Sequence, residues 1–145
     1  MLSEDLSYIA ALLDGEGCIS LQLNHPNDKV RTATYLLKVR ITNTYKPVLD
    51  WLLSVSGGKL YKVKKYMPQR KQAWSWEMSG SEAVQFLHSI YPYLRIKKSQ
   101  AETAFMFGET LSVSGQKKRL SDGIIFIREC LAKRMTEFNC GIEFL

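Results

Sequence analysis

The feature of the sequence that most constrains the fold is a change of apolar period at Asp14–Gly17. Before this point, residues 5–13 carry apolar side chains three and four positions apart, a spacing that predicts a helix with Ser3 as its N-cap. After it, apolar and polar residues alternate from 19 to 23, which predicts a strand with one buried face. The glycines of the Asp14–Gly17 segment are expected to end the helix. The chain therefore begins as a helix followed by a strand.

Helices and strands continue to alternate along the rest of the chain, without a linker long enough to divide it. Gly57-Gly58 is expected to close the second helix, and Ser81 to cap the third. The order predicts an α+β fold of the type αββαββα with further C-terminal helices, in a single domain spanning 1–145. The expected strands are 19–23, 34–43, 59–66 and 73–78, and the expected helices are 5–13, 46–55, 81–91, 98–111 and 121–138.

Each expected strand has one apolar face and one polar or basic face. In the third strand, we expect Tyr61 and Val63 on the buried face and Lys62 and Lys64 on the exposed face. An antiparallel sheet that is apolar on one side and basic on the other can lie in a DNA groove, because β-structure is able to read the major groove.

Positive charge is concentrated in one third of the sequence. The net charge is +6 and the calculated pI is about 9.3. Residues 29–76 contain eleven lysines and arginines but a single acid, Asp50. A phosphate backbone is the counterpart that such a distribution favours over mere solubility.

Localisation is constrained by what the sequence lacks. Its apolar runs are far shorter than the ~20 residues that a membrane span needs, and its acidic start is unlike a targeting peptide. The three cysteines are odd in number and match no metal-ligand spacing, which favours a reducing compartment. We expect an intracellular protein that is not secreted and does not act at a membrane.

The segment Ile9–Gly17 combines features that point to chemistry. The adjacent small residues Ala10 and Ala11 allow another backbone to approach closely. Asp14 and Glu16 fall at the C-terminal end of the helix, where partial negative charge disfavours carboxylates. A bound divalent cation would relieve this conflict, and carboxylate and carbonyl oxygens suit Mg²⁺ rather than Zn²⁺. The alternative is a plain turn between a helix and a strand.

This segment resembles the signature of the LAGLIDADG homing endonucleases. The resemblance extends over about residues 5–110, through the αββαββα order, the basic strands where that family has its DNA-binding saddle, and the segment 91–97. It implies a sequence-specific endonuclease that makes a double-strand break in a long, near-palindromic DNA target and leaves 3′ overhangs. The segment departs from the family consensus conservatively, at Ile9, Ala11, Leu13, Gly15 and Glu16.

The resemblance also implies roles for individual residues. Glu16 is expected to bind the catalytic metal, Mg²⁺ with Mn²⁺ able to substitute, and the Gly15 carbonyl to be a second ligand. Lys97 matches the active-site lysine, with Lys98 as its neighbouring alternative. Asn43 matches a position that orders the attacking water.

One motif in the chain provides one Glu16, whereas a double-strand break requires two active sites. A homodimer that crosses two copies of the motif helix would supply both, and its two-fold symmetry predicts the near-palindromic target. The expected interface consists of Tyr8, Ala11, Leu12, Asp14 and Gly15.

The polar strand faces are expected to contact double-stranded DNA, although for any one residue a solvated surface position is the alternative. Base edges are the expected contacts of Ser20, Gln22, Asn24, Lys38, Arg40, Thr42, Lys62, Lys64, Ser75 and Glu77. Phosphates are the expected contacts of Arg31, Lys46, Arg70 and Lys71.

Two other functions remain open on the same fold. One is a maturase that binds intron RNA, and the other is a DNA-binding regulator that does not cleave. The two histidines, His25 and His88, are too few and too far apart for a histidine-based nuclease or a zinc site. We expect the protein in the compartment of the genome that encodes it.

Overall fold

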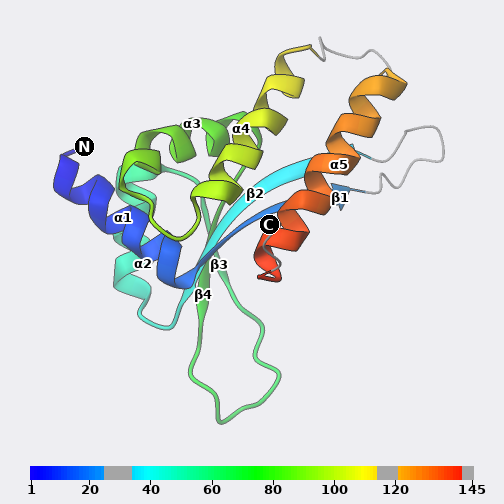
Figure 1. Cartoon of the computed structure of the whole chain (residues 1–145). Coiled ribbons are helices and arrows are strands. Elements are labelled where there is room, and N and C mark those ends of the chain that lie inside the picture. The colour runs from blue at the N-terminus through cyan, green and yellow to red at the C-terminus, as the bar shows by residue number, and fades with distance from the viewer. Residues whose placement is uncertain (25–33, 114–120, 142–145) are drawn as a thin grey trace.

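The computed structural model describes residues 1–24, 34–113 and 121–141, and Figure 1 shows their course. The order of elements confirms the predicted αββαββα arrangement with further C-terminal helices. The elements are α1 (Ser3–Glu16), β1 (Gly17–Asn24), β2 (Thr34–Asn43), α2 (Lys46–Ser56), β3 (Lys59–Lys62), β4 (Trp74–Ser79), α3 (Gly80–Ile90), the short 3₁₀ helix η1 (Tyr91–Tyr93), α4 (Lys98–Val113) and α5 (Asp122–Asn139).

Helix α1 is longer than its apolar spacing predicts, at both ends. Its N-cap is Leu2 rather than Ser3, and the Leu2 N–H donates to the Asp5 carboxylate at 3.3 Å. Gly15 does not end the helix, which continues to Glu16 and is capped by the Gly17 N–H donating to the Leu13 carbonyl. The acidic residues of the motif therefore belong to the last turn of the helix.

Gly17 is required by the close approach of β1 to the end of α1. A Cβ at this position would lie 2.7 Å from the Leu13 carbonyl oxygen, which is backbone and cannot rotate away. We expect Gly17→Ala to lower the free energy of unfolding by about 1–3 kcal/mol, as overpacking does. Urea denaturation measures this change. Gly123→Ala is the control, because nothing lies within 4 Å of that Cβ position, and an equal loss in both variants would contradict the prediction.

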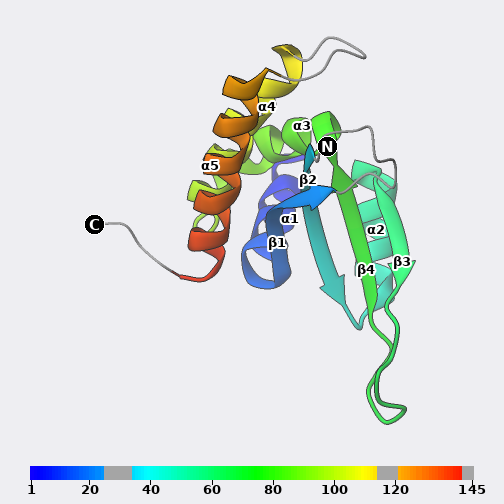
Figure 2. The ribbon, with the colours of Figure 1, turned by 90° about the vertical axis from the view of Figure 1, so that its right-hand side faces the viewer.

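The four strands form one antiparallel sheet in the order β1-β2-β4-β3. Figure 2 shows the strands in this order, with α2 behind β4 and β3. Most apolar residues of β1, β2 and β4 are buried as predicted, and Trp76 is the largest fully buried side chain among the described residues. Leu23, near the end of β1, is an exception and is 45% exposed. The helix-covered side of the sheet therefore holds the core, which includes Ile9, Leu13, Ile19, Leu37, Val39, Ile41, Leu49, Leu52, Leu87 and Ile90.

The prediction for the faces of the third strand was wrong. Tyr61 pairs with Ser75, and Lys62 pairs with Trp74 on the neighbouring strand β4. Because directly paired residues point to the same side of a sheet, Tyr61 lies with Ser75 on the polar face and Lys62 lies with Trp74 on the helix-covered face. The strand is also shorter than predicted and ends at Lys62.

Other boundaries differ by a few residues. Helix α3 begins at Gly80 after Ser79 as N-cap, rather than at Ser81. The turn at Gly57-Gly58 is confirmed, since both residues have positive φ. At Gly58 a Cβ would lie 2.7 Å from the Glu77 carbonyl oxygen, so this turn brings β3 close to β4.

Helices α4 and α5 run side by side as an antiparallel pair (Figure 1). Arg128 of α5 is buried and donates from Nε to Thr110 Oγ1 at 2.9 Å and from Nη2 to the Thr110 carbonyl at 3.1 Å. Burial lowers the pKa of this guanidinium. Asn139, at the other end of α5, donates to the Ile19 carbonyl at 2.8 Å. Side-chain hydrogen bonds thus attach the first half of α5 to α4 and its last residue to β1. In the described ranges, no helix is both long enough and apolar enough to cross a membrane.

Candidate active site and nucleic-acid interface

The last residue of α1 presents an exposed carboxylate. Asn43, at the end of β2, donates from Nδ2 to Oε2 of Glu16. The Asn43 Oδ1 accepts from the Tyr45 N–H at 2.7 Å, so the amide of Asn43 is held at both ends. The structure therefore brings the predicted metal ligand and the predicted Asn43 together, and Asn43 orients the carboxylate directly.

Asp14 is bound to the segment 95–97, which directly precedes α4. Its Oδ2 accepts from the backbone N–H groups of Arg95 at 2.8 Å and Ile96 at 3.2 Å, and its Oδ1 accepts from that of Lys97 at 2.9 Å. Three N–H donors on one carboxylate stabilise its negative charge, which compensates for its place at the negative end of α1. Asp14 is buried, and its carboxylate is occupied within the chain.

Lys97 reaches the same end of α1. Its Nζ donates to the Asp14 carbonyl oxygen at 2.7 Å, whereas the Nζ of Lys98 lies 5.4 Å from the centre of the Tyr91 ring. Of the two candidate lysines, Lys97 is the one that contacts the end of the motif helix. Glu16, Asn43 and Lys97 come from three elements far apart in the sequence and meet around one helix terminus.

Oxygen donors at this terminus suit a hard cation. The second carboxylate oxygen of Glu16 has no hydrogen-bond partner among the described residues, and the Gly15 carbonyl is one of the last of the helix, which have no partner within it. Within the described ranges, no group of three His, Cys, Asp or Glu side chains is placed to hold a metal. Protein side chains would thus supply only part of a coordination shell, as is common for Mg²⁺.

The side of the sheet opposite the core is polar, and we call it the open face. Its polar side chains include Ser20, Gln22, Asn24, Lys38, Arg40, Thr42, Lys59, Tyr61, Ser75 and Glu77. Nine of the ten predicted base-contact residues lie in the strands, and eight of these nine have the predicted orientation, although Ser75 is buried. Lys62 has the opposite orientation, and Lys64 lies beyond the end of β3.

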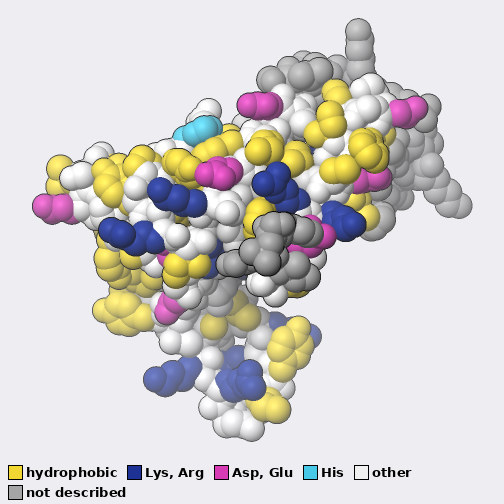
Figure 3. Space-filling model, viewed as in Figure 1, with side chains coloured by type: hydrophobic (Ala, Val, Ile, Leu, Met, Phe, Trp, Pro, Cys, Tyr) yellow, Lys and Arg dark blue, Asp and Glu magenta, His cyan; other side chains and the backbone are white. Residues whose placement is uncertain are grey.

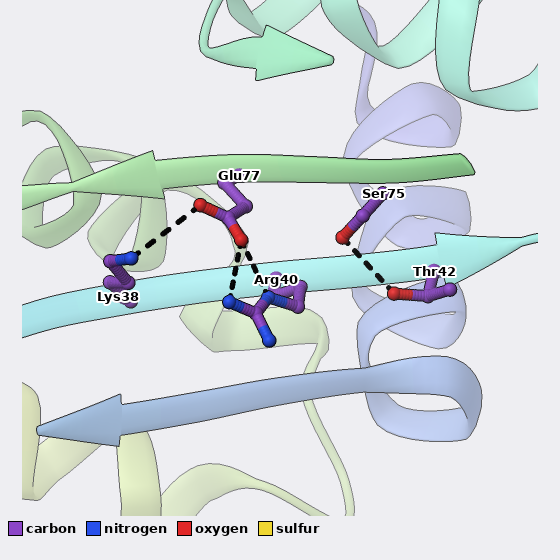
Figure 4. Close-up of polar contacts among 5 residues, drawn as sticks. All are labelled: Lys38, Arg40, Thr42, Ser75 and Glu77. Atoms are coloured by element: carbon purple, nitrogen blue, oxygen red, sulfur yellow. Dashed lines mark hydrogen bonds and ion pairs between the residues drawn. The ribbon is translucent and has the colours of Figure 1, made fainter. Parts of the chain in front are cut away.

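Side chains of neighbouring strands are linked across the open face (Figure 4). Glu77 of β4 accepts from Arg40 of β2 and lies 3.7 Å from the Nζ of Lys38. Thr42 and Ser75 are joined by a hydrogen bond of 3.1 Å between their hydroxyl groups. The open face is therefore an ordered polar surface.

Further cations border the sheet. Trp74 lies between Lys46, whose Nζ is 5.1 Å from the ring centre, and Lys62, at 5.9 Å. Lys46 also forms an ion pair of 2.8 Å with Asp50. Lys64, Arg70 and Lys71 are exposed in the long loop between β3 and β4, which projects from the body of the molecule, and Figure 3 shows basic side chains on this projection. Arg31 lies outside the described residues.

One face of α1 is uncovered. Tyr8 is 53% exposed, Ala11 and Gly15 are exposed, and nothing lies within 4 Å of a Cβ position at Gly15. Leu12 is half-buried and lines a groove with Tyr8, Glu16, Asn43 and Trp51. Four of the five residues predicted for the dimer interface share this face, whereas the Asp14 side chain points inward.

Comparison with solved structures shows which proteins share this arrangement. The homing endonuclease I-CvuI, in complex with its target, superposes with a TM-score of 0.77 at 16% identity, covering 93% of this chain and 82% of that chain. The homing endonuclease I-TnaI gives 0.70 at 14% identity, covering 95% and 97%. The LAGLIDADG homing endonuclease I-SmaMI, bound to cleaved DNA, gives 0.71 at 14% identity, covering 92% and 44%.

This chain has the fold of the LAGLIDADG homing endonucleases. No family model matches the sequence, and a comparison with curated proteins finds no significant match. The predicted family resemblance is thus confirmed at the level of the fold.

Sequence reasoning missed three features of this LAGLIDADG fold. It did not predict the contact of Asp14 with residues 95–97, the place of Tyr61 on the open face, or the position of Trp74 between two lysines. The first is a contact across more than eighty residues and leaves no local signal. The others depend on the pairing of β3 with β4. For Tyr61, the only available indication was its place between Lys59 and Lys62 in the sequence, whereas Trp74 follows Ala73 and precedes Ser75, which give no such indication.

Proposed function

We propose that this protein is a homing endonuclease that recognises a long, near-palindromic DNA sequence and hydrolyses both strands in the presence of a divalent metal ion. The observation that carries the proposal is the exposed Glu16 carboxylate, held by Asn43 at the end of α1 with Lys97 at the same terminus. This terminus lies where β1 and β2 meet α1, beside a polar sheet face of the kind that can enter a DNA groove.

The residues at the terminus fit a hard divalent cation such as Mg²⁺. Glu16 and the Gly15 carbonyl would hold it, and phosphate oxygens or water would complete its shell. When bound there, such an ion would activate water and neutralise charge on the phosphodiester.

The protein residues around the ion position would have separate tasks. Asn43 fixes the rotamer of Glu16, so that the carboxylate is in place before DNA arrives. Lys97 has three N–H groups, of which one donates to the Asp14 carbonyl. The remaining two would add positive charge where negative charge develops on the phosphate.

A library of duplexes with randomised sequence tests the proposal. The protein is incubated with the library in Mg²⁺, in Ca²⁺ or in EDTA, and cleaved ends are sequenced. We expect double-strand cuts at one family of long sequences in Mg²⁺ and none in EDTA. Sequence-selective binding without any cleavage would contradict an endonuclease and favour a DNA-binding regulator, and absence of selective binding would contradict both.

The active form proposed here is a homodimer that pairs two copies of α1. One chain offers one Glu16, and cutting two strands needs two. I-TnaI matches this chain over nearly its whole length, whereas the I-SmaMI chain is matched over 44%, which leaves room in it for a second such unit. The uncovered face of α1, with its small residues Ala11 and Gly15, would allow two helices to approach closely.

Ala11→Glu is expected to disrupt this dimer. Two-fold symmetry would bring the two new carboxylates face to face, and like charges so placed cost several kcal/mol. The dissociation constant of the dimer should therefore rise by about 100-fold or more. Sedimentation velocity over a range of concentrations measures this. Gln85→Glu, which adds the same charge to an exposed position of α3, is the control. A wild-type protein that stays monomeric on its selected DNA would contradict the dimer.

A further inference from the structure

Glu77 is the only acidic residue among the described strand residues that form the open face. An acid here opposes the attraction between a basic surface and DNA phosphates. Its side chain is 18% exposed, so it lies within the polar surface and not at its rim. A Glu77 that contributes to DNA recognition must therefore do so through an effect that outweighs its repulsion of DNA phosphates.

The geometry joins Glu77 mainly to Arg40. The two residues are direct partners in the pairing of β2 with β4. Oε1 of Glu77 accepts from Nε of Arg40 at 2.7 Å and lies 2.6 Å from its Nη2. Oε2 of Glu77 lies 3.7 Å from Nζ of Lys38, which is diagonal to it on β2. Figure 4 shows both cations of β2 turned toward this one carboxylate.

This contact occupies one edge of the Arg40 guanidinium and leaves the other. A guanidinium offers two pairs of parallel N–H groups, the Nε/Nη2 edge and the Nη1/Nη2 edge. Glu77 takes the first edge, and among the described residues the second has no partner. The Arg40 side chain is still 43% exposed. The second edge matches the O6 and N7 acceptors of guanine in the major groove.

The same carboxylate changes how Arg40 and Lys38 respond to phosphates. Their positive charge is partly neutralised at close range, so the gain from contacting an anion falls. A neutral base edge does not repel Glu77 as a phosphate does. The pair therefore favours hydrogen bonds to bases over attraction to the DNA backbone.

We propose that Glu77 is a positioning residue that sets sequence specificity: it holds Arg40 in the orientation that reads guanine and suppresses binding of Arg40 and Lys38 to phosphates. This inference rests on the proposed function, because it requires that the open face lies in the major groove. Arg40 contacts the base, and Glu77 orients the Arg40 side chain.

Selection from a random duplex pool tests the inference. Wild type, Glu77→Gln and Arg40→Lys are each used to select bound DNA in Ca²⁺, and affinity for the selected site and for an unrelated duplex is measured at several salt concentrations. Glu129→Gln is the matched control, since it removes the same charge from an exposed position of α5. Arg40→Lys keeps the charge but loses the fixed fork of donors.

We expect Glu77→Gln to lose a guanine preference at one position by about tenfold or more. Its affinity for the unrelated duplex should be equal or higher, with a salt slope steeper by about one. Arg40→Lys should lose preference at the same position, and Glu129→Gln should change neither quantity.

Three results would overturn the inference. One is a guanine preference in Glu77→Gln that equals that of wild type. Another is loss of a preference for cytosine instead, which would mean that Glu77 reads the base itself. The third is equal weakening on selected and unrelated DNA, the expected result for a merely structural ion pair. A wild-type protein that selects no sequence would contradict the proposed function and this inference together.

Discussion

Glu16→Gln is expected to abolish DNA cleavage while DNA binding is retained. The neutral amide keeps the size of the side chain but removes the charge that would hold a divalent ion at the end of α1. Loss of one preorganised charge-stabilising group slows catalysis by about 100- to 1000-fold, and loss of a metal ligand should reach at least this range. Single-turnover cleavage in Mg²⁺ gives the rate, and binding in Ca²⁺ gives the affinity.

Glu4→Gln provides the matched control for this experiment. Glu4 is an exposed carboxylate in the first turn of the same helix, so its substitution changes the charge of α1 equally but at the opposite end. Cleavage by Glu4→Gln should equal that of wild type within about a factor of two. Wild-type cleavage by Glu16→Gln would reject Glu16 as the metal ligand, and equal loss of binding and cleavage would indicate a role in DNA contact alone.

The second large effect is expected at Asp14. Asp14→Ala removes the acceptor of three backbone N–H groups, those of Arg95, Ile96 and Lys97. Each buried donor left without a partner costs about 1–3 kcal/mol, but Arg95 and Ile96 are exposed and water can reach their surroundings. We therefore expect the free energy of unfolding to fall by about 3–5 kcal/mol in total.

Urea denaturation at a fixed protein concentration measures this loss, since dimer formation makes stability depend on concentration. Asp50→Ala is the control, because its ion pair with Lys46 is exposed and such pairs contribute about 0–1 kcal/mol. Asp14→Asn keeps one acceptor oxygen and should lie between the two. A loss below about 1 kcal/mol for Asp14→Ala would mean that water replaces the carboxylate fully.

Asp14 also changes the physical interpretation of the motif. From sequence, two acids at the negative end of a helix formed one conflict that a cation would resolve. The structure resolves half of this conflict without any ion, since three backbone N–H groups of residues 95–97 donate to the Asp14 carboxylate. Only Glu16 is left with an oxygen that has no hydrogen-bond partner among the described residues. The two acids therefore have different tasks: Asp14 joins α1 to the segment 95–97 before α4, and Glu16 is the candidate ligand.

For Arg40, Lys38 and Glu77, the sequence predicted the face of the sheet but not the contacts between the side chains. The alternation along β2 and β4 placed all three on one face, and the structure confirms this orientation. That Glu77 lies directly opposite Arg40 and occupies one edge of its guanidinium depends on the register of the two strands. Register is set by pairing and turn geometry over the whole sheet, so an analysis of single strands could not supply it.

Sequence patterns predicted the order of elements, most of the buried residues of β1, β2 and β4, the turn at Gly57-Gly58 and the acidic end of α1. These follow from local rules, because the period of apolar residues and the backbone freedom of glycine act over a few positions. Long-range packing brings together the residues that meet at that end: Glu16 with Asn43, and Asp14 with Lys97. It also decided the face of β3, where Leu60 and Tyr61 are adjacent and either could have been buried. The register of β3 with β4 pairs Leu60 with the buried Trp76 and so places Leu60 on the helix-covered face. A shift of this register by one residue would exchange the two faces of the strand.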